Sequence, residues 1–221
     1  MKLLIKFPTR NRKIKFLNVL RKYQNFLSKK NDVKFIITMD SDDSEMDDQL
    51  VKDVLNSYDN LEYYYGDSKT KVEAVNKDIE KISDWDILIL ASDDMIPIVK
   101  NYDEIIINKM KEIYPDTDGV LWFNDGYQGN KLNTLSIVGR KYYDRFGYIY
   151  YPGYKSVWCD NEFMSVAEYL NKQTYFAETI IKHEHPDYGF NMRDEIHILN
   201  SKNESEDRKL FETRKKTNFE L

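Results

Sequence analysis

Cysteine and long apolar runs are the scarcest features of this chain. Cys159 is the single cysteine among 221 residues, so no internal disulfide can form and a structural zinc site rich in thiolates is excluded. No stretch approaches the ~18 uninterrupted apolar residues that a membrane span needs. The apolar run at the N-terminus meets Pro8 too early to be a signal peptide. These absences predict a cytoplasmic protein with no membrane span.

A large excess of charge of either sign is also missing. The chain carries 33 lysines and arginines against 38 aspartates and glutamates, a formal net charge of -5. Such a balance offers no basic surface that captures nucleic acid by counterion release, so a nucleic-acid partner is disfavoured. Hydrophobic residues make up 41% and aromatic residues 14% of the chain. This is enough apolar area to offset the chain entropy of one folded domain.

Apolar segments alternate with amphipathic ones through roughly the first hundred residues. Short apolar runs predict strands at residues 3–7, 33–39, 61–65 and 86–90. Apolar residues at helical spacing predict helices at residues 13–28, 46–55 and 71–82. Strands that alternate with helices in this way are typical of a mostly parallel sheet covered on both faces, which is an α/β fold.

Beyond Pro97 the order of the predicted elements changes. Helices are predicted at 102–114 and 160–170, an aromatic-rich loop at 148–158, and strands at 119–123, 135–138, 174–177 and 179–182. The mixed order predicts an antiparallel or mixed second half that completes the same sheet. Residues 187–221 are strongly polar, which predicts a tail made of a mobile loop and a solvated helix. A lid that closes over the site is the alternative for this tail.

Polar clusters follow three of the predicted strands. They are Thr9 to Arg12, Asp40 to Asp43, and Ser92 to Asp94. Because ligands of open α/β sheets bind beyond the carboxyl ends of the strands, we expect these clusters to converge on one crevice. The two aspartates of the third cluster end a buried strand, where oxygen ligands suit Mg²⁺ or Mn²⁺ beside substrate phosphates. The alternative is that this acidic pair caps the following turn.

Six short segments, in order along residues 1–186, carry a resemblance to a known family. They are Phe7-Pro8-Thr9-Arg10-Asn11-Arg12, Met39-Asp40-Ser41-Asp42-Asp43, Lys71-Val72-Glu73-Ala74-Val75-Asn76, Ala91-Ser92-Asp93-Asp94-Met95-Ile96-Pro97, Cys159-Asp160-Asn161-Glu162-Phe163 and Lys182-His183-Glu184-His185-Pro186. Through them the chain resembles the GT-A glycosyltransferases, especially the family-2-like group. The resemblance implies a Rossmann-like three-layer sandwich with a mostly parallel central mixed sheet, formed by residues 1–186 as a single domain.

The resemblance also implies a donor, a nucleotide-diphosphate sugar, with a UDP-sugar as the expected case. The donor-binding residues it implies are Pro8, Thr9, Arg10, Arg12, Asp40, Asp42, Lys71, Asn76, Ser92 and Asp93. It further implies that Asp93, Asp94 and His185 hold a cation, Mn²⁺ or Mg²⁺, that bridges the donor phosphates. Ala91 stands where the family has the first aspartate of its Asp-x-Asp motif, so one expected carboxylate is missing. A mechanism that relies less on metal therefore stays open.

Two histidines compete for the metal role. His183 and His185 alternate along the last predicted strand, so both side chains are expected on one face. His185, next to Pro186, is the chosen ligand, because a late histidine often occupies this place in the family that the chain resembles. A surface histidine without a function is the alternative.

The helix after the aromatic loop carries the expected general base. By resemblance, Asp160 deprotonates the acceptor hydroxyl in an inverting displacement, and Glu162 is the reserve candidate. A simple amino-terminal cap is the alternative for Asp160. Trp122, Asn124 and Asp125 end a strand on the expected acceptor side, where an aromatic ring stacks on a sugar and polar groups bind its hydroxyls.

These residues predict a hexosyl- or pentosyltransferase that moves a sugar to an acceptor hydroxyl, on a glycan or another compound. A sugar nucleotidyltransferase shares the architecture, but the loop from Pro8 to Lys13 has no glycine that lets backbone amides cradle a triphosphate. A non-catalytic carbohydrate- or nucleotide-binding protein of the same fold is a second alternative, since Ala91 removes one carboxylate. Transfer onto modified DNA is a minority option because of the acidic balance.

Overall fold

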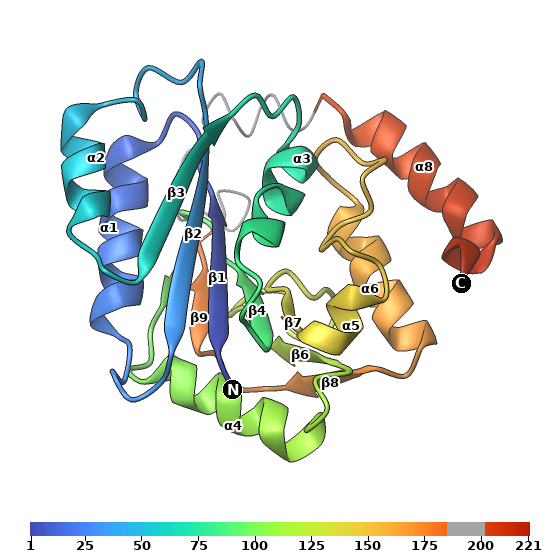
Figure 1. Ribbon diagram of the computed structural model, residues 1–221. Coiled ribbons are helices and arrows are strands. Elements are labelled where there is room, and N and C mark those ends of the chain that lie inside the picture. The colour runs from blue at the N-terminus through green and yellow to red at the C-terminus, as the bar shows by residue number, and fades with distance from the viewer. Residues whose placement is uncertain (185–201) are drawn as a thin grey trace.

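A central sheet organises the chain. The structure, a computed structural model, describes residues 1–184 and 202–221. Its main sheet has seven strands in the order β3-β2-β1-β4-β7-β6-β8, with helices on both faces (Figure 1). These strands are β1 (Leu3–Pro8), β2 (Val33–Asp40), β3 (Leu61–Gly66), β4 (Ile87–Leu90), β6 (Val120–Phe123), β7 (Ile137–Gly139) and β8 (Gln173–Phe176).

The strands of the first half run parallel, as their alternation with helices predicts. β1 lies between β2 and β4, and β3 follows β2, all in parallel pairs. β7 is antiparallel to both β4 and β6, and β8 pairs parallel with β6. The sheet is therefore mostly parallel with a mixed second half, which confirms the predicted α/β class.

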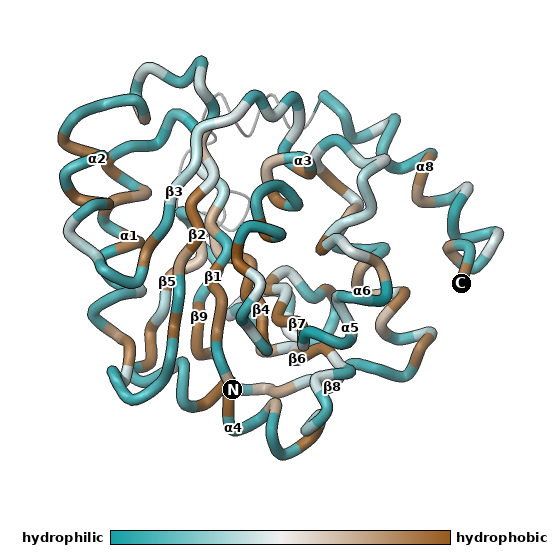
Figure 2. The backbone as a smooth tube through the Cα atoms, viewed as in Figure 1, coloured by the Kyte–Doolittle hydropathy of each residue, from teal (hydrophilic) through white to brown (hydrophobic). Residues whose placement is uncertain are grey.

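Alternate side chains of each strand enter two separate cores. Leu3, Ile5 and Phe7 of β1 pack with three helices on one face, α1 (Lys13–Asn25), α2 (Gln49–Asn56) and α4 (Tyr102–Ile113). Leu4 packs with three helices on the other face, α3 (Lys71–Asn76), α5 (Arg140–Asp144) and α6 (Cys159–Tyr169). Figure 2 shows the apolar residues gathered along the central strands. The result is the expected three-layer sandwich.

The helix predicted at residues 71–82 is interrupted. α3 ends at Asn76, and a short 3₁₀ turn η1 (Ile79–Lys81) follows Asp78, whose φ of 68° is left-handed. Two contacts from buried strand residues explain the break. Lys6 Nζ donates to the Lys77 carbonyl at 2.7 Å, and Thr38 Oγ1 donates to Asp78 Oδ2 at 2.7 Å. Burial lowers the pKa of Lys6 to about 7 although Asp78 opposes the shift.

A second sheet of two strands brings distant parts of the chain together. β5 (Met95–Pro97) pairs antiparallel with β9 (Ile181–His183), with Met95 opposite His183. The sequence predicted a strand at 179–182 but none at 95–97, because three residues show no periodicity. The pairing places His183 beside the strand that follows Asp94.

The C-terminal helix α8 (Glu204–Lys216) packs against α6 (Figure 1). Phe211 is buried, and its ring centroid lies 5.3 Å from that of Trp158. A 3₁₀ turn η3 (Asn218–Glu220) follows α8. The predicted solvated helix therefore has a buried inner face. Across the described residues, no helix is long and apolar enough to cross a bilayer.

Candidate functional site

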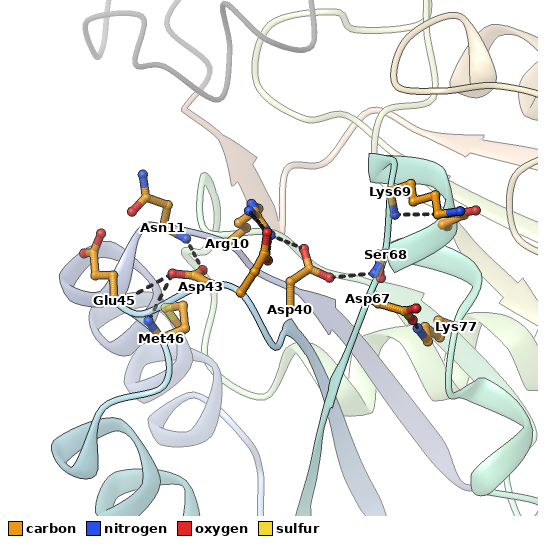
Figure 3. Close-up of polar contacts among 12 residues, drawn as sticks. Arg10, Asn11, Asp40, Asp43, Glu45, Met46, Asp67, Ser68, Lys69 and Lys77 are labelled. Carbon is orange, nitrogen blue, oxygen red and sulfur yellow. Dashed lines mark hydrogen bonds and ion pairs between the residues drawn. The ribbon is translucent and has the colours of Figure 1, made fainter.

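The loops after β1 and β2 are joined by a network of charged side chains. Arg10 donates to Asp40 at 2.8 Å (Figure 3). Arg10 also donates to both carboxylate oxygens of Asp42, at 2.6 and 2.9 Å. The hydrogen bonds from Arg10 hold the pKa of Asp42 below its usual range. Asp43 accepts the backbone N–H of Asn11 at 2.6 Å. Three residues that the sequence predicted for donor binding, Arg10, Asp40 and Asp42, are thus brought together.

The loop after β3 meets the same network through Asp40. The second oxygen of this carboxylate accepts the backbone N–H of Ser68 at 3.0 Å, so the carboxyl ends of three neighbouring strands are tied to one buried side chain (Figure 3). Pro8 ends β1, and the Thr9 backbone N–H donates to the Thr38 carbonyl at 3.0 Å. Thr9 Oγ1 is buried and has no hydrogen-bond partner among the described residues.

The Asp93 carboxylate lies beside two positively charged side chains that follow β1 in the chain. Its side chain is 5% exposed, and Arg12 Nη1 lies 2.8 Å and Lys15 Nζ 3.7 Å from its Oδ1. Burial raises the pKa of Asp93, while Arg12 pulls it in the opposite direction. The carboxylate at the end of β4 is therefore compensated by two residues that follow β1.

Asp94 points to a different set of partners. Ser92 Oγ donates to Asp94 Oδ1, and His183 Nε2 lies 3.6 Å from Asp94 Oδ2. The Asp94 carbonyl also accepts the backbone N–H of Glu184 at 2.7 Å. Burial by itself raises the pKa of Asp94, but the contacts with His183 and Ser92 outweigh it and leave the pKa well below the usual range.

A second carboxylate holds His183 from its other side. His183 Nδ1 lies 3.7 Å from Asp125 Oδ2, and the His183 backbone N–H donates to the Asp125 carbonyl at 2.9 Å. The Asp125 carboxylate is itself fixed by the backbone N–H groups of Tyr127 at 2.8 Å and Gln128 at 2.7 Å and by the Thr134 hydroxyl at 2.8 Å. Burial lowers the pKa of His183, but the two carboxylates outweigh it and raise the pKa to about 9.

Two further candidate site residues, Asp125 and His185, differ in how far the structure describes them. Asp125, expected on the acceptor side, is buried and lies beside His183. His185, the expected metal ligand, lies outside the described residues. The contact of His183 with Asp94 has no signal in the sequence, because the three residues of β5 that align this histidine with Asp94 show no periodicity.

Asp160 lies in the first turn of α6, where its Oδ1 accepts the Asn161 backbone N–H at 3.0 Å. Burial raises the pKa of Asp160, and the positive charges of Lys71 and His183 oppose the rise. Lys71 and His183 are thus the cationic residues whose charge acts on the Asp160 carboxylate.

Four predicted site residues have other contacts in the structure. Glu162 is buried, accepts Arg214 Nε at 2.9 Å and accepts the Tyr154 hydroxyl at 2.8 Å. The Asn76 amide binds the backbone of residues 149 and 150, Trp122 packs edge-on against Tyr175, and Asn124 closes its own turn by accepting Gly126 N–H. The short polar motifs do not reveal the contacts of Glu162, Asn76 and Trp122, because the partners Arg214, Tyr150 and Tyr175 lie more than 50 residues away in the chain.

The donor set suits a cation only in part. Among the described residues no group of three histidine, cysteine, aspartate or glutamate side chains could enclose a metal. Asp93 is bound by Arg12, and Ala91 offers no ligand. Asp94 and His183 remain as one oxygen and one nitrogen donor, and the imidazole must lose its proton to bind metal. Asp94 and His183 could supply two ligands, and the remaining ligands of a cation would have to come from water or a bound substrate, as is common for Mg²⁺-type ions.

Comparison with known proteins gives likeness in structure only. No protein-family model matches the chain, and no curated protein matches it in sequence. Among solved structures, a mannosyltransferase from Pyrobaculum calidifontis in complex with GDP-mannose and Mn²⁺ superposes with a TM-score of 0.68 at 11% identity. The match covers 86% of this chain and 58% of that one, so the chain spans little more than half the length of this neighbour.

Two further neighbours extend the comparison. A Drosophila β-1,4-galactosyltransferase 7 in complex with manganese, UDP-galactose and xylobiose gives a TM-score of 0.55 at 14% identity, covering 87% of this chain and 75% of that one. A 4-diphosphocytidyl-2C-methyl-D-erythritol synthase from Anaerococcus prevotii gives 0.53 at 13% identity, covering 85% and 92%. At such identities the likeness establishes architecture alone. By its sheet order, its three layers and these neighbours, the chain has the GT-A fold.

Proposed function

We propose that this protein is a glycosyltransferase that moves a sugar from a nucleotide-diphosphate donor to an acceptor hydroxyl, with a divalent cation and inversion at the sugar carbon. One observation carries the proposal. Beyond the ends of β1, β2 and β4, Arg12 pairs with Asp93 and Arg10 with Asp40, and the pairing of β5 with β9 brings His183 to Asp94. Positively charged, carboxylate and imidazole side chains gathered at the carboxyl edge of a parallel sheet are suited to bind the phosphates, the ribose and the cation of a nucleotide.

The donor is assigned to the loops that follow β1, β2 and β3. Asp40 and Asp42 are carboxylates suited to hydroxyl groups of a ribose, and Arg10 fixes both. Arg12 and Lys15 are the cations nearest to Asp93 and are suited to a diphosphate. A UDP-sugar is the expected donor, and a GDP-sugar is the first alternative to test because the mannosyltransferase neighbour contains GDP-mannose.

Asp94 and His183 are the residues that would hold the cation, with His185 as a further candidate. A divalent cation bound there would act as a Lewis acid that neutralises charge on the departing nucleoside diphosphate. Asp94 is suited to the role because its carboxylate stays ionised, and His183 because Asp125 fixes its ring from behind.

Asp160 is the proposed general base. It would take the proton of the acceptor hydroxyl while that oxygen forms a bond to the anomeric carbon and the bond to the diphosphate breaks. A carboxylate whose pKa is raised by burial is a stronger proton acceptor than an exposed one, which suits this role. Glu162 is less suited, since Arg214 already binds both of its oxygens.

The test measures nucleoside diphosphate released from a panel of UDP-, GDP- and other sugar nucleotides, with and without Mn²⁺. Metal-dependent release is expected from one donor. Asp94→Asn is expected to lower the rate by about 100-fold or more, and Asp160→Asn by about 100- to 10,000-fold. Asp116→Asn is the matched control, because Asp116 is exposed and pairs with Lys141.

Other outcomes would identify the alternatives. Release of pyrophosphate from a nucleoside triphosphate and a sugar 1-phosphate would favour a nucleotidyltransferase, an activity class represented among proteins of this fold. Tight binding of a sugar nucleotide without turnover across a broad acceptor panel would favour a non-catalytic binding protein. Including glycans and modified DNA in the panel tests both acceptor classes.

A further inference from the structure

A buried carboxylate of α8 is bound by consecutive backbone N–H groups of a distant loop. Asp207 is 1% exposed. Its Oδ1 accepts the N–H of Lys155 at 2.9 Å, and its Oδ2 accepts the N–H groups of Ser156 at 2.9 Å and Val157 at 3.0 Å. A carboxylate that accepts several backbone N–H groups forms strong charge-assisted hydrogen bonds. Asp207 therefore fixes the conformation of the chain from residue 155 to residue 157.

A second anchor from the same helix binds the other side of this region. Arg214 Nε donates to Glu162 in the first turn of α6 at 2.9 and 3.0 Å, and the Arg214 guanidinium carbon lies 3.4 Å from the centroid of the Tyr151 ring. The Tyr154 hydroxyl also donates to Glu162 at 2.8 Å. The two anchors of α8 thus enclose the start of α6 in sequence, one before it and one within its first turn.

The residue between the anchors has an unfavourable backbone. Trp158 immediately precedes α6 with a φ of 63°, a left-handed conformation that is unfavourable for a residue with a side chain. Its ring packs against Phe211 of α8 at 5.3 Å. Such a conformation persists only where its surroundings determine it. Here Asp207 and Phe211 supply those surroundings, and Asp160 lies two residues further on.

We infer that α8 positions Asp160 and that Asp207 is a positioning residue for glycosyl transfer. The inference rests on the proposed function, in which Asp160 is the base. Without the three hydrogen bonds to Asp207, the loop before α6 relaxes from its left-handed turn and the Asp160 carboxylate moves. Misplacement of a reacting group by about 1 Å costs on the order of 100-fold in rate. Within residues 1–184 and 202–221, Arg10 and Asp40 make their hydrogen bonds and ion pairs with residues outside α8, so donor binding is expected to persist.

The experiment compares Asp207→Asn with Glu206→Gln in the full chain. Glu206 is the neighbouring acidic residue of the same helix, but it is exposed and makes a surface pair with Lys155 at 2.7 Å. In Asp207→Asn we expect kcat for transfer to fall about 10- to 100-fold, with the Kd of the donor changed less than twofold. Hydrogen exchange at residues 155–157 is expected to speed up. Glu206→Gln is expected to match the unmodified chain in all three measurements.

Two further results decide the inference. Asp207→Glu, which keeps the charge but moves the carboxylate by one methylene, is expected to lower kcat as well, so the conclusion does not depend on one variant that folds poorly. An unchanged kcat in both Asp207 variants, together with faster exchange at residues 155–157, would overturn the inference and leave the proposed function intact. If the unmodified chain transfers no sugar from any donor, the proposed function fails and the inference fails with it.

Discussion

The buried ion pair between Arg214 and Glu162 offers a sharp test of how the C-terminal helix is held. The Arg214 side chain is 8% exposed and the Glu162 side chain 5%. Among the described residues, Glu162 has one cationic partner, Arg214, and one neutral partner, Tyr154. Arg214 also has Glu220 at 2.8 Å and the Phe219 carbonyl at 3.2 Å. Loss of Arg214 therefore leaves the Glu162 carboxylate without a cation, whereas loss of the Glu162 charge leaves Arg214 with other acceptors.

The loss of unfolding free energy is therefore expected to differ between the Arg214 and Glu162 variants. Arg214→Met leaves the Glu162 carboxylate buried without a cation, and breaking a buried pair in this way costs about 3–5 kcal/mol. Glu162→Gln leaves Arg214 with Glu220 and a carbonyl, so the loss is that of hydrogen bonds to a charged group, about 1.5–3 kcal/mol. The double variant removes both charges, and its cost is expected to fall below the sum of the single costs by about 2–3 kcal/mol.

Urea unfolding followed by tryptophan fluorescence measures these free energies, since Trp158 lies against the helix that is released. Lys141→Met is the control, because its pair with Asp116 is exposed on both sides and such pairs contribute about 0–1 kcal/mol. The reasoning is refuted if Arg214→Met costs less than about 1 kcal/mol, or if the single costs add within about 0.5 kcal/mol in the double variant.

Three further predictions concern the site and its support. Asp125→Asn is expected to weaken Mn²⁺ binding about 10- to 100-fold by freeing the ring of His183, measured by calorimetry against Asp116→Asn; equal affinities would contradict it. Asp43→Ala is expected to destabilise the fold by about 1–3 kcal/mol, because backbone N–H groups in the loops after β1 and β2 lose the carboxylate that accepts them. An unchanged midpoint of urea unfolding would count against this prediction. The folded pKa of Lys6, about 7, lies below its unfolded value of 10.5, so the unfolded chain binds more protons between these values and stability rises with pH across that window. From pH 7 to pH 9 the free energy of unfolding is expected to rise by about 2 kcal/mol more than in Lys6→Met, and a parallel pH dependence of the two proteins would exclude the shift.

Local pattern was enough to predict the fold because its signals lie within single segments. Five of the seven residues from Val33 to Met39 are apolar, and the observed strand β2 (Val33–Asp40) differs from the prediction by one residue at its end. Strand ends are also where Arg10, Asp40 and Asp93 stand, so the convergence of these residues followed from the parallel order of the strands. In a mostly parallel sheet, residues that follow the strands lie at the same edge, so their approximate location can be predicted from the sequence.

The residues that sequence reasoning missed are fixed by pairings between distant segments. The contact between His183 and Asp94 depends on the pairing of β9 with the three residues that follow Asp94. Asp207 stood in a charged tail like any solvated residue, yet it binds a loop 50 residues earlier in the chain. Glu162 and its neighbour Asp160 share one helical turn, and only the position of Arg214 separates a buried structural carboxylate from a candidate base.

The ion pairs of the site also bear on how the proposed donor and cation bind. Asp93 is compensated by Arg12, and Asp94 by His183. A diphosphate that arrives alone must compete with Asp93 for its guanidinium, while a cation that arrives alone must displace the proton of His183. Asp94 and a deprotonated His183 would hold the cation, and Arg12 would bind the phosphates. The cation would reduce the repulsion between the phosphates and the carboxylates of Asp93 and Asp94, so by linkage each ligand would raise the affinity for the other by the same factor.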